Sequence, residues 1–139
     1  GVKYQYEAGI LFADLPSGRS LAYVRPRIEP DPQFGKDGLV YDGMDQVKKK
    51  WTPQRTYGGK LVENLVQAIA RDCLAESLKR LDKAGYDIVI HVHDEVVLNV
   101  PIGTVSVEEV AKIMSEPIDW APGLPLTADG FECEFYRKD

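Results

Sequence analysis

The sequence of 139 residues predicts an α+β domain, in which an N-terminal β-meander precedes an antiparallel sheet packed on one long helix. This sheet contains a hairpin with the residues His93, Asp94 and Glu95, called the HDE hairpin below. Three patterns predict this class: apolar stretches broken by Pro- and Gly-bearing turns before residue 45, a helical repeat over 60–84, and a hairpin pattern after residue 86. A chain of this length has material for one domain, so we expect 1–139 to be a single domain. Its composition, 44% hydrophobic and 28% charged, excludes disordered and fibrous proteins.

Residues 1–45 are predicted to form the β-meander. The apolar stretch 9–13 and the stretch 20–24 flank a turn signal, Pro-Ser-Gly, at 16–18. A third apolar stretch at 39–41 follows a loop that contains Pro and Gly. Because an isolated two-stranded ribbon is marginally stable, we expect three strands packed on another element.

Residues 46–59 are predicted to form a basic loop. The basic side chains from 48 to 60, uninterrupted by an acid, are Lys48, Lys49, Lys50, Arg55 and Lys60, with Trp51 and Tyr57 between them. One interpretation is a loop that holds nucleic-acid phosphates through salt-sensitive contacts independent of base sequence. The other is a solubilising loop whose Trp51 anchors it on the core.

The strongest signal for secondary structure predicts a long helix over 60–84, which Gly85 is expected to end. Apolar side chains recur every four residues at Leu61, Leu65, Ile69 and Cys73. A polar row with the same spacing consists of Glu63, Gln67 and Arg71. This row lies along one side of the helix and is either a solvated face or a binding surface.

Residues 86–139 are predicted to contain a hairpin, a short helix and a last strand. The run IVIHVHDEVVLNVP, from residue 88, indicates two strands joined by a tight turn at His93 and Asp94. Such turns favour Gly, Asn-Gly or Asp-Gly, and a turn built from other residues points to a functional constraint. The short helix is expected to begin after an N-cap at Ser106, and the last strand to cover 131–136.

The hairpin turn has three possible interpretations. His91 and Glu95 suit a metal-dependent hydrolase, although the chain has only two His and carboxylates would have to complete the ligand set. Asp94 and Glu95 are, alternatively, ordinary polar turn residues. The third interpretation is a hard-cation site, since Mg²⁺ takes one or two carboxylates together with substrate phosphates. Two-metal phosphoryl transfer then requires a further carboxylate from elsewhere.

The run YGGKLVENLVQAIARD and the later run IVIHVHDEVVLNV resemble the C-terminal palm region of family A DNA polymerases, the DNA polymerase I type. The flanking runs LPSGRSLAYVRPRI and WAPGLPLTADGFECEFY are similar to phage-type members. The resemblance implies template-directed DNA synthesis, in which nucleotides pass from dNTPs to the 3′-hydroxyl of primer–template DNA by two-metal catalysis.

The resemblance also implies roles for residues of the hairpin. Asp94 matches the catalytic aspartate that binds the two Mg²⁺ ions, and Glu95 matches a secondary acid near these ions. His93 matches a His close to the primer terminus. The common family pattern has Gln where this chain has His91.

On the long helix, Gln67 matches a Gln that contacts the duplex from its minor-groove side. Because it lies one turn further along the polar row, Arg71 is expected to share this DNA-binding surface. The family Asn falls on Glu63 here, with Asn64 displaced by one residue. Asn64 and Lys60 complete the predicted primer- and DNA-binding set.

Two further family motifs, a strand with a second metal-binding aspartate and a fingers helix, do not occur in the sequence. We therefore expect a C-terminal piece of a longer polymerase that acts with the N-terminal remainder and is inactive alone. Its two Mg²⁺ ions would be shared with a carboxylate outside this chain. A non-catalytic nucleic-acid-binding remnant is the remaining alternative.

The charges of the chain are unevenly distributed along the sequence, and this distribution bears on its expected partners. Residues 46–86 hold nine basic and four acidic side chains, net charge +5, which allows a local phosphate-binding face. Residues 87–134 hold one basic and ten acidic side chains, net charge -9. The absence of a membrane-length apolar run and of a leader predicts a chain without membrane contact, in the cytoplasm of a bacterial or phage-infected cell.

Overall fold

The computed structural model describes residues 1–137, which form seven strands and two helices and confirm the α+β class. The chain divides into two compact units, Gly1–Ile69 and the residues from Ala70 onward. This division falls inside the long helix α1 (Gly58–Lys83). That residues 1–139 form a single domain therefore stays a prediction. No helix of the described residues has the length and apolar character required to cross a bilayer.

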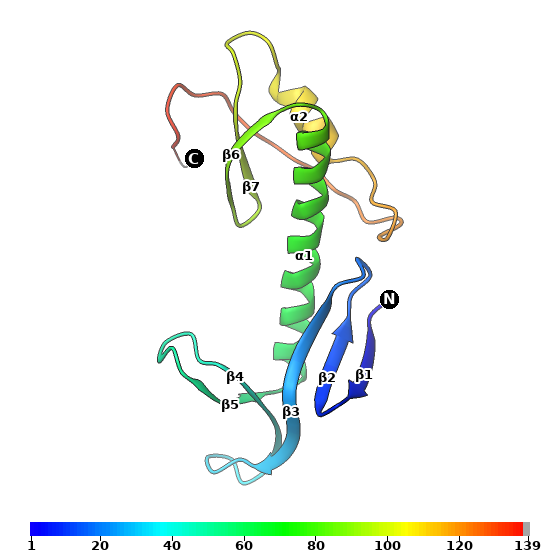
Figure 1. Ribbon diagram of the computed structural model, residues 1–139, viewed down its shortest axis with the longest axis vertical. Helices are drawn as coiled ribbons and strands as arrows, with labels where there is room; N and C mark the ends of the chain where they lie inside the picture. The colour runs from blue at the N-terminus through cyan, green and yellow to red at the C-terminus, as the bar shows by residue number, and fades with distance from the viewer. Residues whose placement is uncertain (138–139) are drawn as a thin grey trace. The chain divides into compact units, whose positions relative to one another are not determined.

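The first unit contains a five-stranded antiparallel sheet, whose strands follow one another in sequence order, and the N-terminal part of α1 (Figure 1). The strands are β1 (Lys3–Glu7), β2 (Ile10–Asp14), β3 (Ser20–Pro30), β4 (Asp37–Met44) and β5 (Trp51–Thr56). The predicted meander is therefore present, with two strands more than expected. β1 was not predicted, although Tyr4 and Tyr6 alternate with polar residues in it, and all five of its side chains are exposed.

β5 occupies six of the fourteen residues predicted as a basic loop over 46–59. The loop itself is short and joins Met44 to Trp51, which pair across the hairpin. The loop was predicted from the run of basic side chains, whereas the structure pairs Pro53 of this segment with Asp42 of β4. β5 is the last strand of the sheet order, and proline is tolerated at such an edge.

β3 contains a β-bulge that the sequence did not predict. Val24 pairs with Asp42 and Arg27 pairs with Val40, so β3 has one residue more than β4 between these pairs. Arg25 takes up the extra length with a φ of +48°, and its N–H donates to the carbonyl of Gly9 at 2.8 Å. The bulge places Arg27 opposite Val40 and sets the direction of the side chains around it.

Tyrosines of the sheet contact α1 in the first unit. The rings of Tyr23 and Tyr41 meet edge to face, with centroids 5.0 Å apart, and Nδ2 of Asn64 donates to the hydroxyl of Tyr23 at 3.2 Å. The buried apolar residues of this unit are Ala13, Leu15, Tyr23, Val40 and Ala68. The side of the sheet that carries Tyr23 and Tyr41 therefore faces the helix.

The second unit contains the C-terminal part of α1, the hairpin of β6 (Asp87–Val92) and β7 (Glu95–Asn99), and α2 (Val107–Met114). The predicted helix end is confirmed, because Gly85 has a φ of +89° and the N–H of Tyr86 donates to the carbonyl of Leu81. Ser106 caps α2 as predicted, in a capping box with Glu109.

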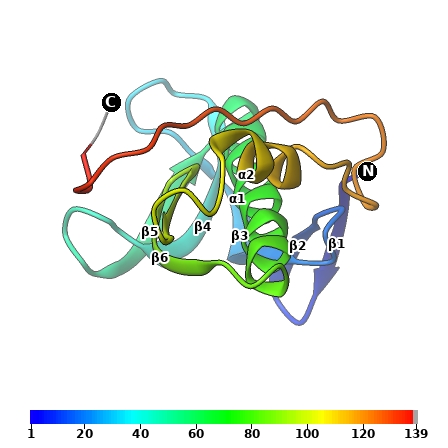
Figure 2. The ribbon, with the colours of Figure 1, turned by 90° about the horizontal axis from the view of Figure 1, so that it is seen from above.

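α2 lies beside the end of α1 in both views of the ribbon (Figures 1 and 2). The guanidinium of Arg80 donates to the carbonyls of Glu116 and Pro117, at 2.8 Å and 2.7 Å, and so holds the segment that follows α2 against α1.

The predicted last strand over 131–136 is wrong. This part of the chain, red in Figure 2, forms no ladder, and the sheet of the second unit consists of β6 and β7 within the described residues. Phe135 is 81% exposed and Tyr136 is half-exposed, so the apolar residues of the segment find no partner strand here. Alternating apolar residues indicate a capacity to pair, and pairing also requires a neighbour.

Candidate functional site

The turn of the β6–β7 hairpin has the two central residues that the sequence predicted. Val92 pairs with Glu95, which leaves His93 and Asp94 between the strands. His93 has a φ of +53°, and Asp94 is not among the residues with positive φ. A positive φ at a central residue of a two-residue turn is usually adopted by Gly, Asn or Asp. The backbone is therefore strained at this turn, within the HDE run.

Asp94 and Glu95 present exposed carboxylates at this turn. Neither carboxylate has a hydrogen-bond or ion-pair partner within residues 1–137, so their lone pairs are open to solvent. Oxygen ligands of this kind fit Mg²⁺. However, no three His, Cys, Asp or Glu side chains of the described chain gather where they could hold a metal ion. The two carboxylates thus fit a partial site that other ligands must complete.

His91, on β6, contacts α1 within the second unit. Nη1 of Arg71 lies 3.3 Å from Nδ1 of His91. Because a guanidinium has only donors, Nδ1 accepts this bond, and a neutral His91 carries its proton on Nε2. A divalent cation at His91 would be repelled by the adjacent Arg71 charge. This contact disfavours the metal-dependent hydrolase built on His91 and Glu95.

The polar row of α1 is linked by side-chain hydrogen bonds in the first unit. Glu63 accepts from Nζ of Lys60 and from Nε2 of Gln67, each at 3.0 Å. The bond with Glu63 raises the pKa of Lys60. Both Lys60 and Gln67 are exposed, so the structure brings these two predicted DNA-binding residues together on a solvent-facing surface.

Asn64 lies on the side of α1 that faces the sheet. Its amide is half-buried and held by Tyr23 through the 3.2 Å bond. A shallow pocket of about 270 Å³ adjoins it, with Tyr41 and Gln67 among the lining residues. Sequence reasoning missed the role of Tyr23, because it lies 41 residues before Asn64 and no local pattern joins them.

Over all of its 139 residues, the chain is 59% identical to a protein named DNA polymerase from Bacillus phage SP02. The chain spans 21% of the length of that relative. No family model matches the chain, and no solved structure gives a significant match to it.

Proposed function

We propose that this chain is the part of a template-directed DNA polymerase, of family A, that carries the HDE hairpin of the palm. The observation that carries the proposal is the 59% identity, over every residue of the chain, to a phage protein named DNA polymerase. The exposed carboxylates of the hairpin turn support it, since they are open to ligands.

In this proposal Asp94 is the metal-binding and catalytic aspartate, and Glu95 assists it. Asp94 and Glu95 would hold Mg²⁺, which would supply activation of the primer 3′-hydroxyl and neutralisation of charge on the triphosphate of the incoming dNTP. The pairing of Val92 with Glu95 closes the hairpin around His93 and Asp94, so the backbone of Asp94 is held in the turn. Because the described residues supply no third ligand, a carboxylate outside this chain completes the site for two ions.

The remaining predicted residues would hold primer–template DNA. His93, exposed beside Asp94, contacts the primer terminus. Gln67 contacts the minor groove, and the Lys60 ammonium and the Arg71 guanidinium supply positive charge for phosphates. Asn64 acts through Tyr23, by holding α1 on the sheet beneath Gln67.

Primer extension by the complete polymerase that contains this segment tests the proposal. Asp94→Asn is expected to lower the single-turnover rate by about a hundredfold to a thousandfold, with affinity for primed DNA little changed. Asp87→Asn is the matched control, because Asp87 is an exposed aspartate at the other end of the same hairpin. Extension by the Asp94 variant at the rate of the control contradicts the proposed role.

A further inference from the structure

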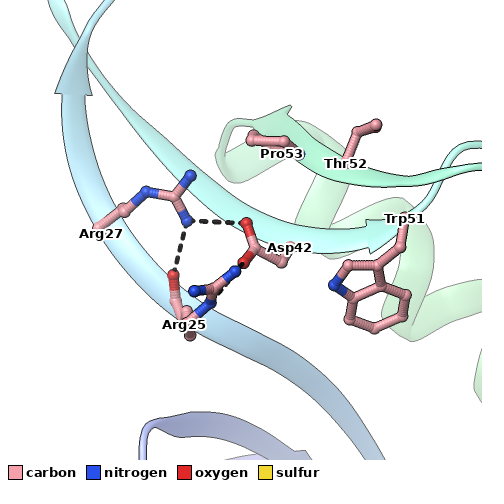
Figure 3. A pocket seen from close by; sticks show the side chains of 6 residues that line it. All are labelled: Arg25, Arg27, Asp42, Trp51, Thr52 and Pro53. Carbon is pink, nitrogen blue, oxygen red and sulfur yellow. Dashed lines mark hydrogen bonds and ion pairs between the residues drawn. The ribbon is translucent and has the colours of Figure 1, made fainter.

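The outer face of the five-stranded sheet carries a second candidate site. Asp42 follows Tyr41 on β4, and neighbouring residues of a strand point to opposite faces. Since Tyr41 lies on the helix side, Asp42 points away from α1. A pocket of about 330 Å³ surrounds it, lined by Arg25, Arg27, Asp42, Trp51, Thr52 and Pro53 (Figure 3).

Asp42 organises this pocket by binding two arginines. Its side chain is only 3% exposed, and it accepts from Nε of Arg25 at 2.5 Å and from Nη1 of Arg27 at 3.0 Å (Figure 3). Burial acts to raise the pKa of Asp42, but the hydrogen bonds from Arg27 and Arg25 outweigh it and hold this pKa below its usual range. The carboxylate therefore stays ionised and fixes both guanidinium groups.

Arg25 is fixed and accessible at the same time. Its side chain is 73% exposed although it is bound to Asp42, and part of its donor fork faces solvent. Its backbone has the φ of +48° described for the bulge, a conformation that is unfavourable for a residue other than glycine. Backbone strain of this kind often marks a functional residue. The guanidinium of Arg25, which is bound to Asp42 on one side and exposed on the other, is suited to bind an external anion.

Trp51 supplies an aromatic surface in the same pocket. Its side chain is 56% exposed at the start of β5, beside the short loop between Met44 and Trp51. The exposed cations of that loop are Lys48, Lys49 and Lys50. Asp45 orders the loop, since its carboxylate accepts from the backbone N–H of Val47 at 2.9 Å and of Lys48 at 2.8 Å.

We propose that this pocket and the loop beside it bind single-stranded DNA. An unpaired base stacks on Trp51, a phosphate binds Arg25, and the loop lysines hold the neighbouring phosphates. Stacking on an exposed aromatic ring requires a base that is not paired, so single strands are favoured over duplex. The site lies in the first unit, whereas the HDE hairpin lies in the second, and it does not depend on polymerase activity.

Binding of a labelled twelve-residue oligothymidylate to the 139-residue chain, followed by fluorescence anisotropy at several salt concentrations, tests this site. Trp51→Ala is expected to weaken binding about tenfold. Arg25→Gly, which suits the positive φ and removes the guanidinium, is expected to weaken binding several-fold and to reduce the steepness of the salt dependence.

The matched controls are Tyr6→Ala, an exposed aromatic of β1, and Lys36→Ala, an exposed cation of another loop. Both are expected to bind as the unaltered chain does. Equal affinity of the Trp51 and Arg25 variants with these controls, tighter binding of a duplex of the same length, or no binding at low salt each overturns the proposal. A polymerase unaffected by Asp94→Asn would refute the catalytic assignment and leave this result standing.

Discussion

Arg71 of α1 donates a hydrogen bond to Nδ1 of His91 on β6, and this contact connects the long helix with the HDE hairpin inside the second unit. It involves the residue at which this chain departs from the common Gln of the resembled family. It also defines the hydrogen-bonding state of an exposed imidazole two residues before the turn, which makes it accessible to measurement.

Arg71→Ala is expected to change the tautomer populations of the neutral His91 side chain. With Arg71 present, neutral His91 carries its proton on Nε2, because the guanidinium donates to Nδ1. Without it, the Nδ1–H form becomes populated, which ¹⁵N chemical shifts of the imidazole report at a pH where His91 is neutral. His93 provides an internal control in the same spectra. An unchanged His91 tautomer in the variant would show that the contact does not form in solution.

The stability of the chain is expected to depend on Asp42 at acid pH. Its folded-state pKa is lowered from 3.8, so its ionised form stabilises the fold above that value, and this contribution is lost as the pH falls through the lower folded-state pKa. Chemical unfolding at pH 7 should therefore show Asp42→Asn to be the less stable protein, with the difference shrinking below about pH 4.

Asp37→Asn is a matched control for this measurement, because Asp37 is exposed at the start of the same strand. The control should remain close to the unaltered chain in its free energy of unfolding. A constant difference between the Asp42 variant and the unaltered chain from pH 7 to pH 2 would exclude the titration of this carboxylate as the cause.

His93→Gly is expected to be more stable than His93→Ala by about 1 kcal/mol, because glycine adopts the positive φ of this turn without strain. Denaturant unfolding of the two variants measures the difference. In the complete polymerase both variants should extend primers more slowly, if the imidazole contacts the primer terminus as proposed. Full activity of the glycine variant would restrict His93 to a turn residue.

Glu95→Gln is expected to reduce primer extension by the complete polymerase less than Asp94→Asn. Both carboxylates are exposed without a partner in the described chain, but only Asp94 matches the catalytic aspartate of the resembled family. Parallel single-turnover rates with saturating Mg²⁺ rank the two variants. An equal or larger loss at Glu95 would reverse their roles.

The 139-residue chain alone is expected to incorporate no nucleotide on a primed template, because its described residues gather no metal-binding cluster. Gel analysis of a labelled primer with dNTPs and Mg²⁺ checks this outcome, with the complete polymerase as the positive control. Extension by the isolated chain would mean that its own residues complete the metal site.

Local signals account for what the sequence predicted well. The apolar repeat of α1, the glycine at its end, the Ser106 cap and the two-residue turn at His93 each depend on residues close together in the chain. These features needed no knowledge of the remaining fold, and the structure has all of them. The open carboxylate of Asp94 also follows from its place in a tight turn.

Contacts between distant residues account for what the sequence did not predict. Asp42 binds arginines that lie 17 and 15 residues before it, and the bulge that directs them changes the register of two strands. One signal was available: Pro26 interrupts a run of strand-forming residues, and proline inside a strand often marks a bulge or an edge. The segment 131–136 shows the reverse case, in which a strand-like pattern has no neighbour.

The position of Pro53 has a consequence for the behaviour of the chain at high concentration. An outermost strand offers unsatisfied N–H and C=O groups to other molecules, and such groups seed aggregation. β5 carries a proline there, and the opposite outermost strand, β1, is short and bears Lys3 and Glu7. Both edge strands of the five-stranded sheet therefore disfavour edge-to-edge pairing between two copies of the chain.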